Sequence, residues 1–508
     1  MDAKFPKVVT DSRAGASRLA AWLDGEPQPS YAIARRWFLR ALGLIFAIAF
    51  VSFWVQVDGL IGARGILPVP DFLAAAQEML GARAPFALPT LVWFDSSNAF
   101  LHGLCGAGTA AALLLIAGIA PPLCLALLFV LYLSLVVVGQ TFLSFQWDIL
   151  LLETAFFAIF LAPWQWRARA SRPAPVSRVG LLLMRLLLFK LMFMSGAVKL
   201  TSGDDSWWNL SALDYHYETQ PLPNVLAWWM AQTPEWFKHV STLFALVVET
   251  VASLGIWGPR RVRLGACALL VALQLLIALT GNYTFFNWLA IALCLLLVDD
   301  AVLRRGRSDS AAVRTRSVWI QNRLAAGVLV LTLPVNALYL ASAAWPRTPW
   351  PAAVEGIAAV LEPFHVLNGY GLFRVMTRSR PEIEIQGSDD GEDWKPYGFR
   401  WKPGPLDRPP PCVAPYQPRL DWQMWFAALS SYQRTPWFAH FALRLLEGDP
   451  DVLALLETNP FPDAPPRYLR ARLYAYHFTT WAERRATGDW WKREEIGEYL
   501  PVVSRRER

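Results

Sequence analysis

Several ionisable residues lie inside long apolar stretches of this 508-residue chain, where a charge is costly. They are Asp148, Glu153, Lys190, Lys199 and Glu249. A charged side chain at the centre of a membrane span costs about 2.5–3.5 kcal/mol on insertion scales, so each of these residues is a candidate for function. Opposite charges offset this cost only when they pair with good geometry. We therefore expect either ion pairs that fix the register of helices or a site that binds a substrate or cofactor.

The depth of each charge predicts which residues meet. Lys190 and Glu249 both lie about 15 Å from the outer end of their stretches at about 1.5 Å per residue, so we expect them to pair. Glu153, about 9 Å deep by the same count, is the alternative partner of Lys190. Asp148 and Lys199 lie near the outer boundary and form a shallower candidate pair.

The segment 201–238 carries acids and one histidine among aromatic residues, between two apolar stretches. Its candidate site residues are Asp214, Tyr215, His216, Tyr217, Glu218 and Gln220. In an extended segment, residues two apart point to one side, so His216 and Glu218 would suit a proton relay or a metal site. One histidine with carboxylates is a sparse ligand set, and no metal is assigned. The alternatives are a loop folded back across the mouth of a helix bundle and a binding surface for a client or substrate.

Composition identifies the class of protein. Hydrophobic residues make up 55% of the chain and charged residues only 17%, against about 25% in soluble proteins. The net charge of +7 comes with arginines that cluster between apolar runs, which is typical of cytoplasmic loops and not of a nucleic-acid surface. The five cysteines form no CxxC or Cys/His cluster, so neither a zinc site nor a disulfide framework is indicated.

About nine transmembrane helices are predicted, because a span needs roughly 20 mainly apolar residues. Their approximate ranges are 37–57, 101–119, 121–142, 147–163, 181–200, 239–257, 262–280, 282–298 and 322–345. With the N-terminus inside, the Arg-rich loops fall on the cytoplasmic side, and the segments 58–100 and 201–238 fall outside. The chain then divides into a cytoplasmic segment 1–36, a transmembrane bundle 37–345 and an extracytoplasmic domain 346–508.

The C-terminal region changes character, because apolar runs shorten and proline and charge become common. Strands are predicted at 370–377, 382–386, 394–401 and 468–481, with a hairpin turn at 388–391. Helices are predicted at 421–433, 436–447 and 450–457. We expect an α-helical polytopic membrane protein with a small α+β domain on its outer face.

Three motifs in this order resemble the lipase maturation factor family. They read Asp-Tyr-His-Tyr-Glu-Thr-Gln-Pro-Leu-Pro-Asn at 214–224, Tyr-Gly-Leu-Phe-Arg-Val-Met-Thr at 370–377 followed by Arg-Pro-Glu-Ile at 380–383, and Pro-Tyr-Gln-Pro-Arg-Leu-Asp-Trp-Gln-Met-Trp at 415–425. The resemblance implies a chaperone-like maturation factor that assists the folding and assembly of secreted lipases or similar exported clients. It also implies the endoplasmic reticulum membrane in a eukaryote. The Ala/Arg/Trp-rich composition looks bacterial, which would instead imply the plasma membrane.

A shorter stretch resembles a helix end of the vitamin K-dependent gamma-carboxylase family. It reads Phe-Met-Ser-Gly-Ala-Val-Lys-Leu at 193–200 and is followed by Trp207 and Trp208. This similarity implies a membrane enzyme acting on a quinone or lipid, with Lys199 as the candidate base. A transporter is a third class, but no internal repeat supports it. The chain lacks GxSxG, P-loop and HExxH motifs in a supporting context, so we do not expect a lipase. The expected partners are an exported lipase-like protein and membrane lipid.

Overall fold

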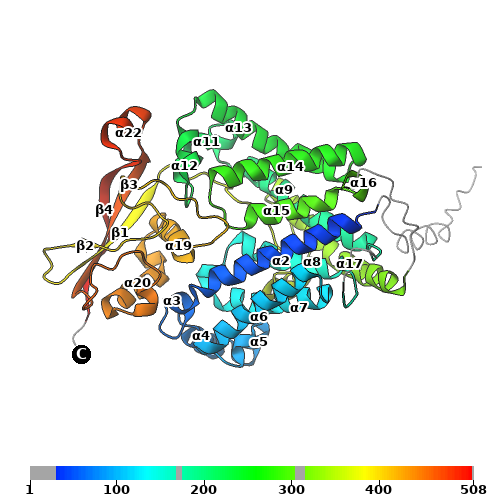
Figure 1. Ribbon diagram of the computed structural model, residues 1–508, viewed down its shortest axis with the longest axis horizontal. Coiled ribbons are helices and arrows are strands. Elements are labelled where there is room, and N and C mark those ends of the chain that lie inside the picture. The colour runs from blue at the N-terminus through cyan, green and yellow to red at the C-terminus, as the bar shows by residue number, and fades with distance from the viewer. Residues whose placement is uncertain (1–29, 168–173, 304–314, 506–508) are drawn as a thin grey trace, which may run out of the picture.

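The computed structural model describes residues 30–167, 174–303 and 315–505. Residues 1–29 of the predicted N-terminal segment and parts of two Arg-rich loops therefore lie outside the described residues, while the last residues of that segment already belong to a helix that begins at Ala32. The molecule is elongated, with strands and α19 to α22 at one end and α16 with the start of α2 at the other (Figure 1). We call the end that carries the strands the outer end.

Seven helices in the described ranges are long and apolar enough to cross a membrane. They are α2 (Ala32–Trp54), α6 (Asn98–Ala117), α7 (Pro121–Val138), α9 (Arg178–Thr201), the run Glu235–Trp257, α14 (Arg260–Thr280) and α17 (Arg316–Ala344). The run comprises α13 (Glu235–Val247), the π-helix η4 (Val248–Ala252) and η5 (Gly255–Trp257). The predicted fold class is confirmed: this is a multi-span integral membrane protein.

Two of the nine predicted spans form shorter helices. They are α8 (Gln146–Ile159) and α15 (Phe286–Cys294), which η6 (Leu295–Leu297) continues. The 14 residues of α8 rise about 21 Å, less than the hydrocarbon core of about 30 Å. Nearly all of α8 is buried between α7 and α9. A short helix is tolerated there because protein, not lipid, surrounds the irregular backbone at its ends.

Polar contacts tie the bundle together at the end opposite the strands. The Asp300 carboxylate in α16 (Asp300–Leu303) accepts hydrogen bonds from the backbone N–H groups of Ala32 and Ile33, both at 2.9 Å. A carboxylate at this position satisfies free N–H groups and offsets the positive end of the α2 dipole. The Arg260 guanidinium donates to Asp299 at 2.6 Å. Of the arginines that the structure describes, Arg260 and Arg263 lie at this end, where both approach Asp299.

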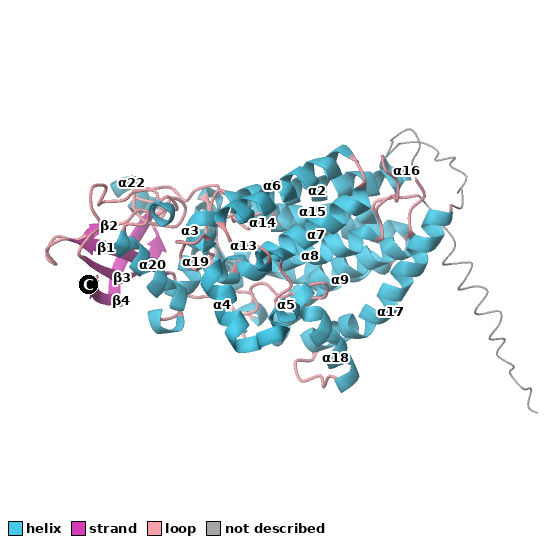
Figure 2. Cartoon of the chain, turned by 90° about the horizontal axis from the view of Figure 1, so that it is seen from below, coloured by secondary structure: helices cyan, strands magenta, loops and turns pink. Residues whose placement is uncertain are grey.

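The segment 201–238 lies towards the outer end, where Figure 1 labels α11 and α12, and Figure 2 shows the four strands of the C-terminal sheet gathered at that end. The segment forms three helices: α10 (Asp205–Trp208), α11 (Ala212–Thr219) and α12 (Val225–Ala231). The connection between α2 and α6 is also helical, with α3 (Val57–Ile61), α4 (Val69–Leu80), η1 (Gly81–Arg83), α5 (Ala84–Ala87) and η2 (Leu91–Trp93). Further short helices are η3 (Gln140–Leu143), α18 (Ala352–Leu361) and η7 (Glu362–Phe364).

A four-stranded antiparallel sheet with the order β2-β1-β3-β4 forms the C-terminal domain. Its strands are β1 (Pro381–Ser388), β2 (Lys395–Pro396), β3 (Tyr468–Phe478) and β4 (Trp491–Ser504). In the β1–β3 pair, Ile383 lies opposite Leu473. The helices are α19 (Arg419–Ala428), η8 (Tyr432–Arg434), α20 (Pro436–Glu447), α21 (Pro450–Leu453) and α22 (Trp481–Thr487).

The predicted strand at 370–377 is wrong, because side chains of the bundle take its backbone N–H groups. The Gly371 N–H donates to Gln146 Oε1 at 3.1 Å, and the Met376 N–H donates to Asp204 Oδ2 at 2.6 Å. Strand β4 was missed, because nine of its 14 residues are exposed and five of them are charged. Charge of this kind protects an edge strand from pairing with other chains and hides the alternation that identifies a strand. The turn between β1 and β2 and the helix at 436–447 are confirmed.

Candidate functional site

Lys190 and Glu153 form a fully buried ion pair in the middle of the bundle, between α9 and α8. Lys190 Nζ also donates to Asn336 Oδ1 at 2.9 Å, while Glu153 Oε2 accepts from the Tyr370 hydroxyl at 2.6 Å and from the Asn368 N–H at 3.1 Å. Neither side chain of the pair is exposed. The alternative partner predicted for Lys190 is therefore correct. The site is also closed, because every charge in it has partners.

Asp148 pairs with Arg419 and not with Lys199, so the predicted shallow pair is wrong. Arg419 is the first residue of α19 and reaches into the bundle, where its Nη1 and Nη2 atoms donate to the two Asp148 oxygens at 2.6 and 2.9 Å. The Tyr132 hydroxyl donates to Asp148 Oδ1. Both charged side chains are fully buried. Depth counting compares spans only, so it could not find a partner that belongs to the C-terminal domain.

Lys199 pairs with Glu249, so the predicted Lys190–Glu249 pair is also wrong. Lys199 Nζ donates to both Glu249 oxygens, at 2.7 and 2.6 Å. Glu249 lies in the π-helix η4, a local widening that re-aims side chains and is often found at functional sites. Gly196 allows this close approach of α9 and η4, because a Cβ atom there would lie 2.6 Å from Thr250 Cγ2.

A cavity of about 90 Å³ lies beside the Lys199–Glu249 pair. Its walls come from α9, α10, α11, α13, η4, α14, the start of α15 with the preceding Tyr283, and the loop around Phe373. The polar side chains on these walls are those of Ser195, Lys199, Trp207, His216, Glu249, Gln274 and Tyr283. Lys199 Nζ lies 5.2 Å from the centre of the Trp207 ring, close enough for a cation–π contact. We call this space the Lys199 cavity.

His216 borders this cavity and is neutral at physiological pH. The Tyr283 hydroxyl donates its one proton to Gln220 Oε1 at 2.8 Å, so the His216 Nε2 atom, 3.0 Å from that oxygen, must be the donor. The orientation of the Gln220 amide is fixed because its Nε2 atom donates to the Thr280 carbonyl. Burial, and then the Lys199 charge, lower the pKa of His216 to about 4. Its Nδ1 atom therefore carries a free lone pair.

His216 and Glu218 do not converge, because 212–219 is a helix and not the extended segment we assumed. Residues two apart on a helix point to different faces. Glu218 turns to the sheet, where it accepts from the Phe478 N–H at 2.8 Å and lies 3.0 Å from His477 Nδ1. The proposed relay or metal pair is not formed. Across the described ranges, no group of three or more His, Cys, Asp or Glu residues is arranged to hold a metal ion.

The other predicted residues of α11 hold the segment 201–238 in place. Asp214 pairs with Lys238 at 3.0 Å and with His239 at 3.1 Å. Tyr217 is buried in a small aromatic cluster that includes Trp228 and Trp491. Tyr215 lies under the Arg378 guanidinium, whose carbon is 5.7 Å from the ring centre.

Two residues that sequence reasoning missed join the three motifs to one another. The fully buried Arg380 donates to the backbone carbonyls of Glu218, Gln220 and Pro221. The Trp425 Nε1 atom donates to the Thr219 carbonyl at 2.9 Å. The second and third motifs therefore both clamp the first. Two arginines, Arg380 in the second motif and Arg419 in the third, were the sequence signal that could have indicated buried polar contacts between these regions.

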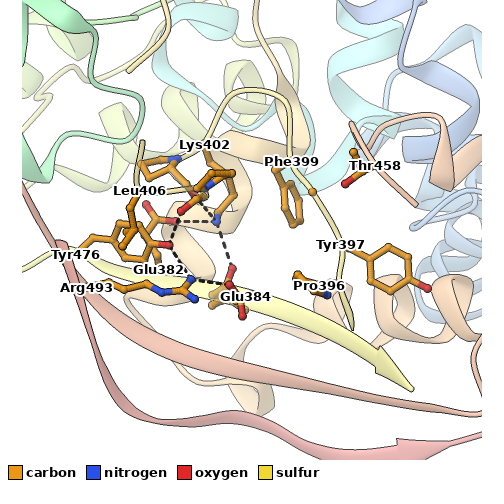
Figure 3. Close-up of a pocket in the computed structure, with 15 residues that line it drawn as sticks. Glu382, Glu384, Pro396, Tyr397, Phe399, Lys402, Leu406, Thr458, Tyr476 and Arg493 are labelled. Atoms are coloured by element: carbon orange, nitrogen blue, oxygen red, sulfur yellow. Dashed lines mark hydrogen bonds and ion pairs between the residues drawn. The ribbon is translucent and has the colours of Figure 1, made fainter. Parts of the chain in front are cut away.

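A larger cavity, of about 320 Å³, lies in the C-terminal domain (Figure 3). Lys402 contacts Glu382 at 2.9 Å, and Arg493 contacts Glu384 at 2.6 Å. Figure 3 shows these charged side chains together on one side, with aromatic rings and Pro396 farther along. Because both acids are neutralised by cations, this cavity is suited to binding and not to acid–base chemistry. We call it the sheet pocket.

Comparison with known proteins finds two family models that match this chain. Residues 33–305 match the family model described as the lipase maturation factor transmembrane domain, and residues 366–501 match the lipase maturation factor C-terminal domain. Lipase maturation factor 2 of Gallus gallus is 37% identical over 92% of this chain and 81% of its own length. The human protein of that name is 35% identical over 93% and 83%, and lipase maturation factor 1 of Mus musculus is 35% identical over 92% and 86%.

No solved structure matches the chain. The comparisons give no support to the gamma-carboxylase resemblance. Lys199 was the one residue to which that resemblance assigned a role, and both Glu249 oxygens hold it in an ion pair. The two family models together cover most of the chain, and the relatives match it along nearly its whole length. The chain belongs to the lipase maturation factor family.

Proposed function

We propose that this protein is a membrane-embedded maturation factor that assists the folding and assembly of an exported lipase or a similar client. The relatives carry that function in their names. One structural observation carries the proposal: the three family motifs meet at a single buried joint between the bundle and the C-terminal domain. Their residues hold a surface in place instead of assembling a catalytic centre, which is what a folding platform needs.

We propose the outer end as the working face, on the extracytoplasmic side. Arg-rich segments at the opposite end support this orientation, because basic loops stay in the cytoplasm. The membrane would be the plasma membrane in a bacterium and the endoplasmic reticulum membrane in a eukaryote. An exported client meets the working face only if the C-terminal domain lies on that side.

Within this face, the sheet pocket is the part best suited to an unfolded client segment. Strand β2 pairs with β1 only at Gln386 and Gly387, so no described strand pairs with the first half of β1 on that side. Lys402 Nζ covers the Ile383 carbonyl on that edge, at 3.2 Å. Extended peptides add to open strand edges, and neighbouring pockets select their side chains. The proline and aromatic walls of the sheet pocket provide such selection.

The test is the specific activity of an exported lipase made with and without this protein in the same host. We expect the lipase to lose activity per molecule when the protein is absent, while its transcript level stays the same. A catalytically inactive lipase variant, produced in parallel, is the control, because its secreted amount shows whether loss of this protein changes the yield of secreted lipase. If every exported hydrolase keeps its specific activity after deletion, the proposal is wrong.

A further inference from the structure

We propose that the Lys199 cavity binds the acyl carbonyl group of a membrane lipid, with the acyl chain leaving between α13 and α14 into the bilayer. The class of ligand is a neutral acyl ester that also carries a hydroxyl group, such as a monoacylglycerol. This inference does not rest on the proposed maturation function. It rests on the position of the cavity, on its unpartnered polar atoms and on its size.

The position of the cavity gives lipid access to it. Ala245 on α13 and Ile277 on α14 line the cavity and are only half-buried. Their neighbours Leu243 and Leu276 are exposed apolar residues on spans, as expected of a surface that faces lipid. Helix α14 packs against η4 and η5, deeper in the bundle. The outer halves of α13 and α14 therefore flank a route from the bilayer to the cavity.

The cavity wall holds a buried hydrogen-bond donor that lacks a partner. Trp207 is 4% exposed, and its Nε1 atom makes no hydrogen bond to any residue that the structure describes. A buried donor without an acceptor is unfavourable, and native proteins nearly always satisfy such groups. An oxygen acceptor in the cavity would satisfy it.

The charges and hydrogen-bond acceptors around Trp207 restrict the chemical class of ligand that the cavity can bind. Lys199 is already neutralised by Glu249, so the cavity does not require an anion, and an ester carbonyl suits it. The free lone pair of His216 Nδ1 accepts a hydrogen bond, which a ligand hydroxyl can donate. A carbonyl for Trp207 and a hydroxyl for His216 occur together in the head group of a monoacylglycerol.

The size of the cavity excludes a complete lipid. A volume of about 90 Å³ is smaller than the apolar cavity of about 150 Å³ that holds one benzene molecule. This is room for an ester group and the first carbons beside it. The remainder of the chain must therefore run along the apolar surface of α13 and α14, where the bilayer supplies its contacts.

Binding of monoolein to the full-length, delipidated protein in detergent tests the inference, with native mass spectrometry as the readout. Trp207→Phe keeps the ring but removes the donor, and we expect binding about five-fold weaker, the usual effect of one lost hydrogen bond. Trp422→Phe is the matched control. Trp422 is also buried with an unpartnered Nε1 atom, but it lies outside the cavity, so its variant should bind as the wild type does.

A second variant keeps the test decisive if Trp207→Phe fails to fold. Ala245→Trp blocks the rim from a half-buried position and should abolish binding while the unfolding temperature stays near that of the wild type. Oleic acid in place of monoolein distinguishes the sources of the carbonyl. Tighter binding of oleic acid that Trp207→Phe still weakens would support the carbonyl contact and make the ligand a fatty acid. Equal binding by Trp207→Phe, Ala245→Trp and the wild type would overturn the inference.

Discussion

Two lysines on the same helix, α9, lie in contrasting surroundings. Lys190 is completely buried, and its partner Glu153 is held in turn by Tyr370 and Asn368. Lys199, nine residues closer to the outer end, is paired with one carboxylate and borders a cavity. Both would be called intramembrane charges from the sequence. The difference shows that two features decide the role of such a charge: the number of hydrogen-bond partners it has and whether a cavity lies beside it. A fully partnered charge holds two segments together, whereas a charge beside a cavity can take part in binding.

The two fully buried ion pairs, Lys190–Glu153 and Arg419–Asp148, both lie where the C-terminal domain packs on the bundle. Arg419 enters from α19 to reach Asp148, and Tyr370 enters from the preceding segment to reach Glu153. In both cases a polar side chain of the C-terminal region satisfies an acid of α8. We infer that these acids are kept because they fix the C-terminal domain on the bundle.

Breaking the joint should produce the largest effect. Asp148→Asn leaves Arg419 buried without a counter-charge, and the loss of a single partner in such a pair costs about 3–5 kcal/mol. We expect a large fall in the thermal unfolding midpoint in detergent. Replacing both residues with apolar ones, in the double variant Asp148→Leu/Arg419→Met, should recover most of the loss. A double variant as unstable as Asp148→Asn would show that the pair does more than join the two regions.

Removing the acid of the Lys199–Glu249 pair should lower the free energy of unfolding by less than Asp148→Asn does. Glu249→Gln removes the charge beside Lys199, but Lys199 is 7% exposed and adjoins a cavity that water can enter. We expect a loss of about 1.5–3 kcal/mol, the usual contribution of a hydrogen bond to a charged group. The same unfolding measurement applies. If Glu249→Gln and Asp148→Asn lower the free energy of unfolding equally, the proposed difference between the fully buried pair and the pair beside the Lys199 cavity is wrong.

The pH dependence of stability should show the environment of His216. Its pKa in the folded protein is about 4, below the ordinary value of about 6.5 in an unfolded chain. Between these values the unfolded chain binds a proton that the folded protein does not, so stability falls as pH decreases from 6.5 towards 4. Because the side chain is only partly buried, we expect about 1 kcal/mol between pH 7 and pH 5.

His216→Gln is the control for this pH dependence, because it removes the titrating ring but keeps a polar side chain. Its unfolding midpoint should fall less than that of the wild type over the same range of pH. Parallel curves for the two proteins would mean that His216 is not buried as the structure has it.

The smallest effect should come from the pair between α11 and β3. His477 is half-exposed, and exposed pairs contribute about 0–1 kcal/mol. His477→Ala should therefore change the unfolding midpoint slightly and leave lipase maturation intact. Glu218 also accepts from the Phe478 N–H, so Glu218→Ala should cost more than His477→Ala. If His477→Ala lowers the unfolding midpoint more than Glu218→Ala does, the ion pair and not the hydrogen bond from Phe478 makes the main contribution to the contact between α11 and β3.

The sequence predicted those features that depend on local pattern. The bundle, the helix at 436–447 and the β1–β2 turn follow from apolar length, periodicity and turn residues. Glu153 was found as a partner of Lys190 because both lie within spans. The shorter lengths of α8 and α15 were not predictable in this way, because neighbouring helices shield their ends.

The rest of the candidate site depends on contacts between distant segments. Arg419 follows its partner Asp148 by 271 positions and belongs to another region, so depth counting could not join them. The Lys199–Glu249 pair needs the π-helix η4 and the missing side chain of Gly196, neither of which a periodicity count reveals. His216 and Glu218 were expected on one side of an extended segment, whereas in the helix Ala212–Thr219 they face different neighbours.

The central claim is that the assembled outer face lies outside the cytoplasm, where an exported client can reach it. Cys412 reports on this face, because it is exposed and the other four cysteines are buried. A membrane-impermeant maleimide applied to bacterial spheroplasts that carry the protein in their plasma membrane should label the wild-type protein, and Cys412→Ser should remove the label. Labelling of Cys412 only after the membrane is permeabilised would place the C-terminal domain in the cytoplasm and contradict the account.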